Sequence, residues 1–265
     1  MRKYIISVDC EGVACVVGLP GNALGSGAGY EFAQRQATLE ANAAAVALFD
    51  AGADEVVVWD SHGTGVNLHY DLLDPRCKIA LGSYYGSRYP GLDEGYDGIL
   101  FIGYHAKEGT RDAVLAHTMS STTYQYVKVN GVEVGELEID GAIAGRYGVK
   151  VLFAASDDAG VKQAKECFPW IETVSTKRGY GWHAAVSLHP KAAQDEIYAA
   201  VRRAMEREDE MQCYHFEEPM HVSIRYKRLD AAQAAQQFDR ERKPFIFADG
   251  FTREGVLDDV TQLFV

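Results

Sequence analysis

The chain has 265 residues, of which 47% are hydrophobic and 24% charged, as is typical of a soluble globular protein. Its formal net charge of −12 argues against a nucleic-acid partner, which needs a basic face, and against binding to an anionic membrane surface. The five cysteines contain no C-x-x-C pair and the charged start, Met1-Arg2-Lys3, leads into no apolar signal core, so we expect reduced thiols and a cytoplasmic location.

Strand and helix patterns alternate from the N-terminus onward. Short apolar runs predict strands at 4–8, 55–59, 78–81 and 98–104, and an alanine-rich segment with an apolar face predicts a helix over 31–50. Gly52 follows this helix at a position where many helices end on a left-handed residue. Because strands that alternate with helices form parallel sheets, we expect an α/β fold with a mostly parallel sheet flanked by helices.

The second half of the chain is predicted to be more varied. A β-hairpin is expected at 124–134, because Asn130-Gly131 separates two alternating segments and both residues tolerate positive φ. The patterns then predict a helix at 135–147, a strand at 149–155, a helix opened by Asp157-Asp158, a helix at 190–209, strands at 221–226 and 245–247, and helices at 231–242 and 254–264. We therefore expect a core at 1–190 and a smaller mixed α+β C-terminal portion at 191–265 packed on it, unless the two form one continuous domain.

Acidic residues and histidines stand where three predicted strands end. Asp9 and Glu11 follow the first strand, Asp60 and His62 the second, and His105 the fourth. In a parallel sheet the carboxyl ends of the strands share one edge, and ligands bind in the crevice there. Carboxylates and imidazoles that converge on one crevice are typical of metal sites. This arrangement predicts a metalloenzyme.

Each of these residues also has an ordinary structural explanation, and only their convergence favours the metal. Asp60 is as well suited to ordering a loop as to binding a metal. Glu136 begins a predicted helix, where the helix dipole alone favours an acid, so its spacing does not distinguish it from Glu133 or Glu138. His117 lies in the loop after residue 104, and the pattern leaves it open as a ligand, a general base or a residue without a role.

Two further features are less informative. The glycine-rich stretch 18–29 contains Gly25-Ser26-Gly27-Ala28-Gly29, but its G-x-G-x-G spacing and its distance from the strand disfavour nucleotide binding. A long loop between strand and helix is more typical of a lid or a contact surface. His183, beside Trp182, is more simply explained by a core or surface role than by a place in the site.

Several short segments together resemble the zinc D-aminopeptidases of peptidase family M55, which are related to the dipeptide-transport-associated enzyme of bacilli. The matching segments are Ser7-Val8-Asp9-Cys10-Glu11-Gly12, Asp60-Ser61-His62, Gly103-Tyr104-His105-Ala106, Ala116-His117-Thr118-Met119 and Val134-Gly135-Glu136-Leu137. They occur in the order and with the separations of the family, and as a set they are far more specific than any one of them. Beyond about residue 190 we find no such segment.

The resemblance implies a site with two zinc ions per subunit. Asp9 would bridge both ions, Glu11 and His62 would complete one, and His105 and Glu136 would complete the other. The resemblance thus selects Glu136 over the neighbouring acids. It also implies a ring-shaped homo-oligomer, a decamer of two stacked pentamers whose active sites face an inner channel.

The activity implied by the resemblance is that of a metallo-aminopeptidase that removes the N-terminal residue of short peptides containing D-amino acids. A metal-activated hydroxide would be available at neutral pH, and His117, which matches the family's catalytic histidine, would transfer a proton or attack covalently. The alternatives are a dinuclear metal amidase acting on a non-peptide amide and a non-catalytic metal- or peptide-binding protein. The presence of every matched ligand and of His117 disfavours the non-catalytic alternative.

Overall fold

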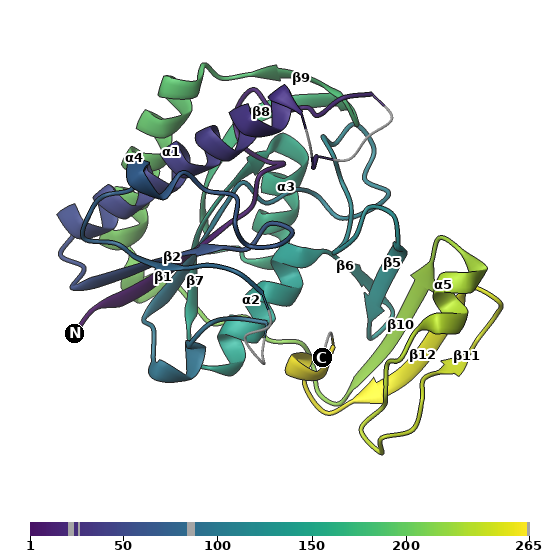
Figure 1. Cartoon of the computed structure of the whole chain (residues 1–265). Coiled ribbons are helices and arrows are strands. Elements are labelled where there is room, and N and C mark those ends of the chain that lie inside the picture. The colour runs from purple at the N-terminus through teal and green to yellow at the C-terminus, as the bar shows by residue number, and fades with distance from the viewer. Residues whose placement is uncertain (21–23, 26, 84–87, 264–265) are drawn as a thin grey trace.

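A seven-stranded sheet forms the centre of the structure, a computed structural model that describes residues 1–20, 24–25, 27–83 and 88–263 (Figure 1). Its strands are, in spatial order, β3 (Lys78–Ala80), β2 (Glu55–Asp60), β1 (Lys3–Val8), β4 (Gly98–Ile102), β7 (Lys150–Asp157), β8 (Glu172–Gly181) and β9 (Ala184–Ser187). Neighbouring strands are parallel from β3 to β8, and only the pairing of β8 with β9 is antiparallel. The predicted fold class, a mostly parallel sheet flanked by helices, is confirmed.

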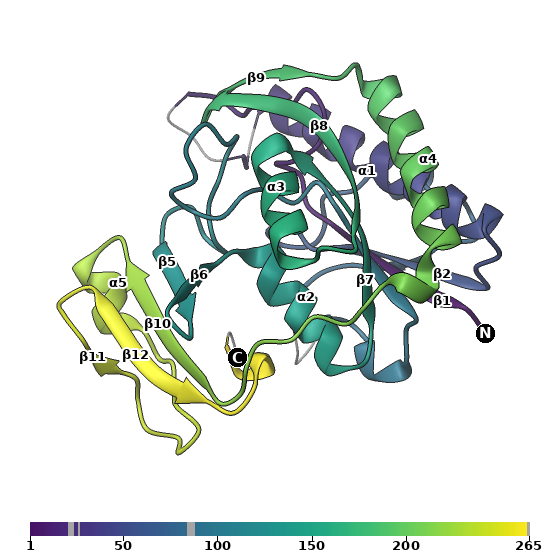
Figure 2. The same cartoon turned by 180° about the vertical axis from the view of Figure 1, so that it is seen from behind.

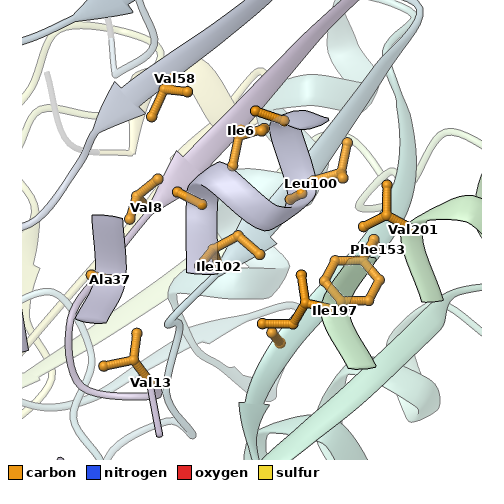
Figure 3. Close-up of a cluster of buried hydrophobic side chains, with 14 of the residues drawn as sticks. Ile6, Val8, Val13, Ala37, Val58, Leu100, Ile102, Phe153, Ile197 and Val201 are labelled. Atoms are coloured by element: carbon orange, nitrogen blue, oxygen red, sulfur yellow. The ribbon is translucent and has the colours of Figure 1, made fainter. Parts of the chain in front are cut away.

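Helices cover both faces of this sheet (Figures 1 and 2). On one face lie α1 (Ala28–Asp50) and α4 (Pro190–Glu206), and on the other α2 (Glu136–Arg146) and α3 (Asp158–Cys167). Alternate strand residues point to opposite faces, so that Ile6 packs below α1 and α4 whereas Ile5 belongs to the cluster around α2 and α3. Figure 3 shows the first cluster, where Leu100 of the sheet and Ile197 of α4 are buried together. Burial on both faces explains the continuous apolar runs in the sequence.

A second, five-stranded antiparallel sheet lies beside the central layers (Figure 2). Its strands are, in spatial order, β11 (Ile246–Phe247), β12 (Thr252–Leu257), β10 (Met220–Tyr226), β5 (Tyr124–Val129) and β6 (Val132–Val134). The predicted hairpin is confirmed, with positive φ at both Asn130 and Gly131. This sheet combines the hairpin with strands after residue 219. A division of the chain near residue 190 would therefore assign strands of one sheet to both portions.

Two of the predicted C-terminal helices are wrong. The helix expected over 231–242 is only the short α5 (Leu229–Ala234). The segment expected to form a helix over 254–264 begins instead within β12, which pairs with β10 along its length, and its last predicted residue, Phe264, lies outside the described residues. Strand formation depends on such a pairing partner more than on intrinsic preference, and the local sequence does not show that β10 is the partner. The strands β8 and β9 were not predicted.

The shorter elements are 3₁₀ turns at Tyr70–Leu72, Leu92–Glu94, Glu208–Glu210 and Val260–Gln262. Gly52 ends α1 with a φ of +91°, as predicted. Among the described residues, no helix is long and apolar enough to cross a membrane.

The order of the strands reverses at β1. From β1 the chain proceeds through β2 to β3 on one side, and it then returns to form β4 on the other side. Val8 at the end of β1 is level with Asp60 in β2 and with Ile102 in β4, so the loops that follow these strands open at one edge. Ligands of α/β proteins bind at such a switch point.

Candidate metal centre

The loops after β1 and β4 touch each other directly through their backbones. The amide of Gly12 donates a hydrogen bond to the carbonyl oxygen of Gly103 at 2.7 Å. A Cβ on Gly12 would lie 2.0 Å from the carbonyl oxygen of Tyr104, and one on Gly103, whose φ is +72°, would lie 2.1 Å from that of Asp9. Only glycine permits this approach at both positions. The contact fixes the spacing between the Asp9 loop and the loop that carries His105.

The five predicted metal ligands converge on one place. The Nδ1 atom of His62 lies 2.7 Å from Oδ1 of Asp9 and 3.2 Å from Oε2 of Glu11. The Nε2 atom of His105 lies 3.5 Å from Oδ2 of Asp9 and 3.3 Å from Oε1 of Glu136. Asp9 therefore presents one carboxylate oxygen to each histidine. Because β1 ends at Val8, Asp9 and Glu11 reach this point from a turn rather than from a strand.

His117 adjoins the second of these groups. Its ring stacks on that of His105, with 3.9 Å between the ring centroids, and its Nε2 lies 3.7 Å from Oε1 of Glu136. Its Nδ1 lies 2.7 Å from the carbonyl oxygen of Leu115, to which it donates, so the lone pair of Nε2 faces the site. The position suits a proton-transfer group, and His105, His117 and Glu136 also lie close enough together to share one cation.

Buried polar atoms at this point have no hydrogen-bond partner, and a bound cation would serve as their partner instead. Among the described residues, Oε2 of Glu11 and Nε2 of His105 are buried without a hydrogen-bond partner. Both have oppositely charged atoms close by, but not in hydrogen-bonding geometry. The Nδ1 of His105 donates to the carbonyl oxygen of Ala106 at 3.0 Å, which leaves Nε2 free to act as a ligand. Carboxylate oxygens and imidazole nitrogens together form a donor set that zinc accepts.

The charges of the cluster are strongly coupled. Burial alone would lower the pKa of His105, but the facing carboxylates of Glu136 and Asp9 raise it to about 10. Burial would raise the pKa of Glu136, yet the charge of His105 brings it to about 2. Burial likewise opposes ionisation of Asp9, but the hydrogen bond from His62 holds its pKa well below the usual range. Without a cation, protonated imidazoles balance the carboxylates, so binding of a divalent ion would release protons.

Asp60 does not point into the site but orders the loop that follows His62. One of its carboxylate oxygens accepts the backbone amides of Asn67 at 2.6 Å and Leu68 at 2.9 Å, and the other accepts the side-chain amide of Asn67 at 2.7 Å. Of the two roles left open by the sequence, the structure therefore supports the ordering of the loop. The loop in turn holds His62 at the edge of the sheet.

His183 and Trp182 form hydrogen bonds to the backbone of the loops around the site. The Nδ1 of His183 lies 2.8 Å from the carbonyl oxygen of Val17, and the indole of Trp182 donates to the carbonyl oxygen of Ala116 at 3.0 Å. These bonds tie the hairpin turn between β8 and β9 to the loops around the site. Of the glycine-rich stretch, residues 21–23 and 26 lie outside the described residues.

The sequence matches the profile of the D-aminopeptidase family Peptidase_M55 over residues 1–243. The chain belongs to this D-aminopeptidase family. It is accordingly a metallo-aminopeptidase, a hydrolase that acts on peptide bonds. A D-aminopeptidase of Bacillus subtilis (strain 168) is 34% identical over 212 residues, which are 79% of this chain and 76% of that protein.

A solved structure has the same fold as this member of the D-aminopeptidase family. It is described as the Zn-dependent D-aminopeptidase DppA from Bacillus subtilis, a self-compartmentalizing protease. It matches with a TM-score of 0.86 at 25% sequence identity, over 99% of this chain and 93% of that chain. The family resemblance found in the sequence is thus confirmed, and the segments that carried it all lie within the matched region.

Sequence reasoning missed a lysine beneath the site of this D-aminopeptidase family member. The buried ammonium of Lys177, in β8, donates to the carbonyl oxygens of Glu11 at 2.5 Å, Val13 at 2.8 Å and Val16 at 2.6 Å. Burial lowers its pKa to about 8, although nearby carboxylates oppose the shift. The sequence held no signal for this role, because β8 was not predicted and its contacts connect residues more than 150 positions apart.

Proposed function

We propose that the protein is a dinuclear zinc aminopeptidase that removes the N-terminal residue of short peptides containing D-amino acids. The observation that carries the proposal is the placement of Asp9, whose two oxygens face two different histidines, His62 and His105. A carboxylate in this position would help to hold both ions of a two-metal hydrolase site. Membership of the D-aminopeptidase family and the likeness to a Zn-dependent enzyme support the choice of zinc and of D-amino-acid substrates.

The proposed ligands divide into two sets around Asp9. Glu11 and His62 would complete the first zinc site, and His105 and Glu136 the second. Their three carboxylates would carry three negative charges against the four positive charges of two zinc ions. When bound, the zinc ions would lower the pKa of a coordinated water toward roughly 7 and polarise a carbonyl group.

In this proposal the catalytic group of the chain is His117. The carbonyl oxygen of Leu115 holds the proton on Nδ1, so that Nε2 is free to accept a proton and later to deliver it to the leaving amine. Stacking on His105 fixes the direction of the ring toward Glu136. His117 would thus act on substrate held in the cavity of about 250 Å³ that it lines together with Asp9 and Glu136.

A zinc titration of the metal-free protein tests this function. Protein stripped with a chelator should hydrolyse no dipeptide, and activity should rise until about two equivalents of zinc per subunit are bound, because both ions take part. Dipeptides that differ only in chirality should show faster release of an N-terminal D-residue. A plateau at one equivalent would contradict the dinuclear site, and faster cleavage of the L-forms would contradict the D-preference. Hydrolysis of non-peptide amides alone would favour the amidase, and zinc binding without any hydrolysis a binding protein.

We also propose that the subunits assemble into a closed homo-oligomer, specifically a ring-shaped decamer. The support is the likeness to a protease described as self-compartmentalizing. A cavity that opens into an enclosed space would admit short peptides and exclude folded proteins. Sedimentation equilibrium should give a mass ten times that of the 29.1 kDa chain, and a monomer at micromolar concentration would contradict the proposal.

A further inference from the structure

One cationic side chain stands in the wall of the site cavity. Arg88 is the only lysine or arginine among the described residues that line it. Its Nη2 lies 3.9 Å from Oε2 of Glu136, a proposed zinc ligand, and 26% of its side chain is exposed. A positive group therefore lies next to the proposed metal centre and is open to the cavity.

The guanidinium of Arg88 is held in a fixed orientation. Its Nε and Nη2 donate to the two carboxylate oxygens of Asp140 at 3.0 and 2.9 Å. Asp140 is fully buried and also accepts a hydrogen bond from the hydroxyl of Tyr104 at 2.7 Å. The guanidinium lies over the ring of Trp59, 5.3 Å from its centroid. A guanidinium fixed in this way loses little further entropy when it binds an anion.

We propose that Arg88 binds the C-terminal carboxylate of the substrate and thereby makes free dipeptides the preferred substrates; this rests on the proposed function. A guanidinium and a carboxylate form a strong charge-assisted pair. In a dipeptide the C-terminal carboxylate is only one residue beyond the scissile bond, close to the metal centre as Arg88 is. Each further residue would move the carboxylate outward by up to about 3.3–3.6 Å, beyond the reach of a side chain fixed to Asp140.

The test compares a dipeptide with its own C-terminal amide, which differs from it only in lacking the negative charge. The dipeptide is the one that the zinc-loaded wild type cleaves fastest, and kcat/KM is measured for both compounds. Wild type should prefer the free acid by about ten- to hundredfold, the range expected for a hydrogen-bonded charge pair. Arg88→Gln should bring this ratio close to one, mainly through the KM of the free acid.

Two further variants make the ratio interpretable. Arg88→Lys keeps the positive charge but lacks the planar guanidinium that can pair with a carboxylate through two nitrogens, so its ratio should fall below that of wild type. This variant replaces Arg88→Gln in the test if Arg88→Gln does not fold. Arg228→Gln is the matched control, because Arg228 is exposed and its ion pair among the described residues is with Asp230, two positions away. It should keep the wild-type ratio. Since each ratio is taken within one preparation, a partly inactive variant does not distort it.

The outcomes that overturn the proposal are distinct. The proposal is overturned if the wild type does not prefer the free acid. It is also overturned if Arg88→Gln loses hydrolysis of the free acid and of the amide equally, since Arg88 would then stabilise the reaction itself. If Arg88→Gln does not fold, a wild-type ratio in Arg88→Lys overturns the proposal. A zinc-loaded wild type that hydrolyses none of the dipeptides of either chirality refutes the proposed function and with it this assignment, whereas hydrolysis without a preference for the free acid refutes the assignment alone.

Discussion

Replacing Asp9 by alanine is expected to remove both of the proposed zinc ions and to reduce peptide hydrolysis below detection. Asp9 is the one proposed ligand whose oxygens face both His62 and His105, so a single change affects both zinc sites. Loss of the carboxylate also removes one of the negative charges that face the imidazoles of His62 and His105. Elemental analysis and kinetics on the same preparation, with circular dichroism as a check of folding, measure this effect.

The control is His69→Ala, which removes an imidazole outside the site cavity. His69 precedes the 3₁₀ turn at Tyr70–Leu72 and does not line that cavity. This variant should keep its metal and nearly all of its activity. Should the two variants behave alike, or should Asp9→Ala retain one full equivalent of zinc, the bridging role of Asp9 would be wrong.

His117→Ala is expected to keep its metal but to lose most of its turnover. The five proposed ligands suffice without His117, whereas the loss of a general acid or base lowers rates by roughly 10²–10⁴-fold. The loss should appear in kcat more than in KM, because proton transfer acts in the transition state. Zinc content and steady-state kinetics are to be measured on one preparation, with His215→Ala, which removes an exposed histidine, as the matched control.

The distances around His117 make a different result informative. Because His117, His105 and Glu136 are close enough to share a cation, a variant that loses zinc would identify His117 as a ligand. A variant that keeps both zinc and full activity would show that His117 takes no part in the reaction.

The strand ends, and the convergence of acidic residues and histidines just beyond them, were predictable from the sequence for one physical reason. The central strands of a parallel sheet are buried on both faces, so they form apolar runs whose ends are easy to locate. The first polar residues beyond those runs, among them Asp9 and His105, then necessarily lie at one edge of the sheet.

Other parts of the site depend on contacts that no local pattern reveals. The spacing could not separate Glu136 from its neighbours, but in the structure Glu133 is exposed and Glu138 accepts the backbone amide of Gly135 at 2.9 Å. Only Glu136 turns toward the histidines. The role of Arg88 likewise depends on Asp140, 52 residues further along the chain, which orients its guanidinium.

The ammonium of Lys177 has a consequence for how the metal is acquired. It already gathers three carbonyl oxygens of the turn that carries Glu11, a task that an inorganic cation performs in many loops. In a zinc finger much of the binding energy is consumed in folding the peptide around the ion. Here the turn is shaped by an internal cation that cannot dissociate, so the apoprotein is a preorganised receptor. Little of the binding energy of zinc would then be consumed in shaping this turn, and the cost that remains is the release of protons from the imidazoles that face the carboxylates.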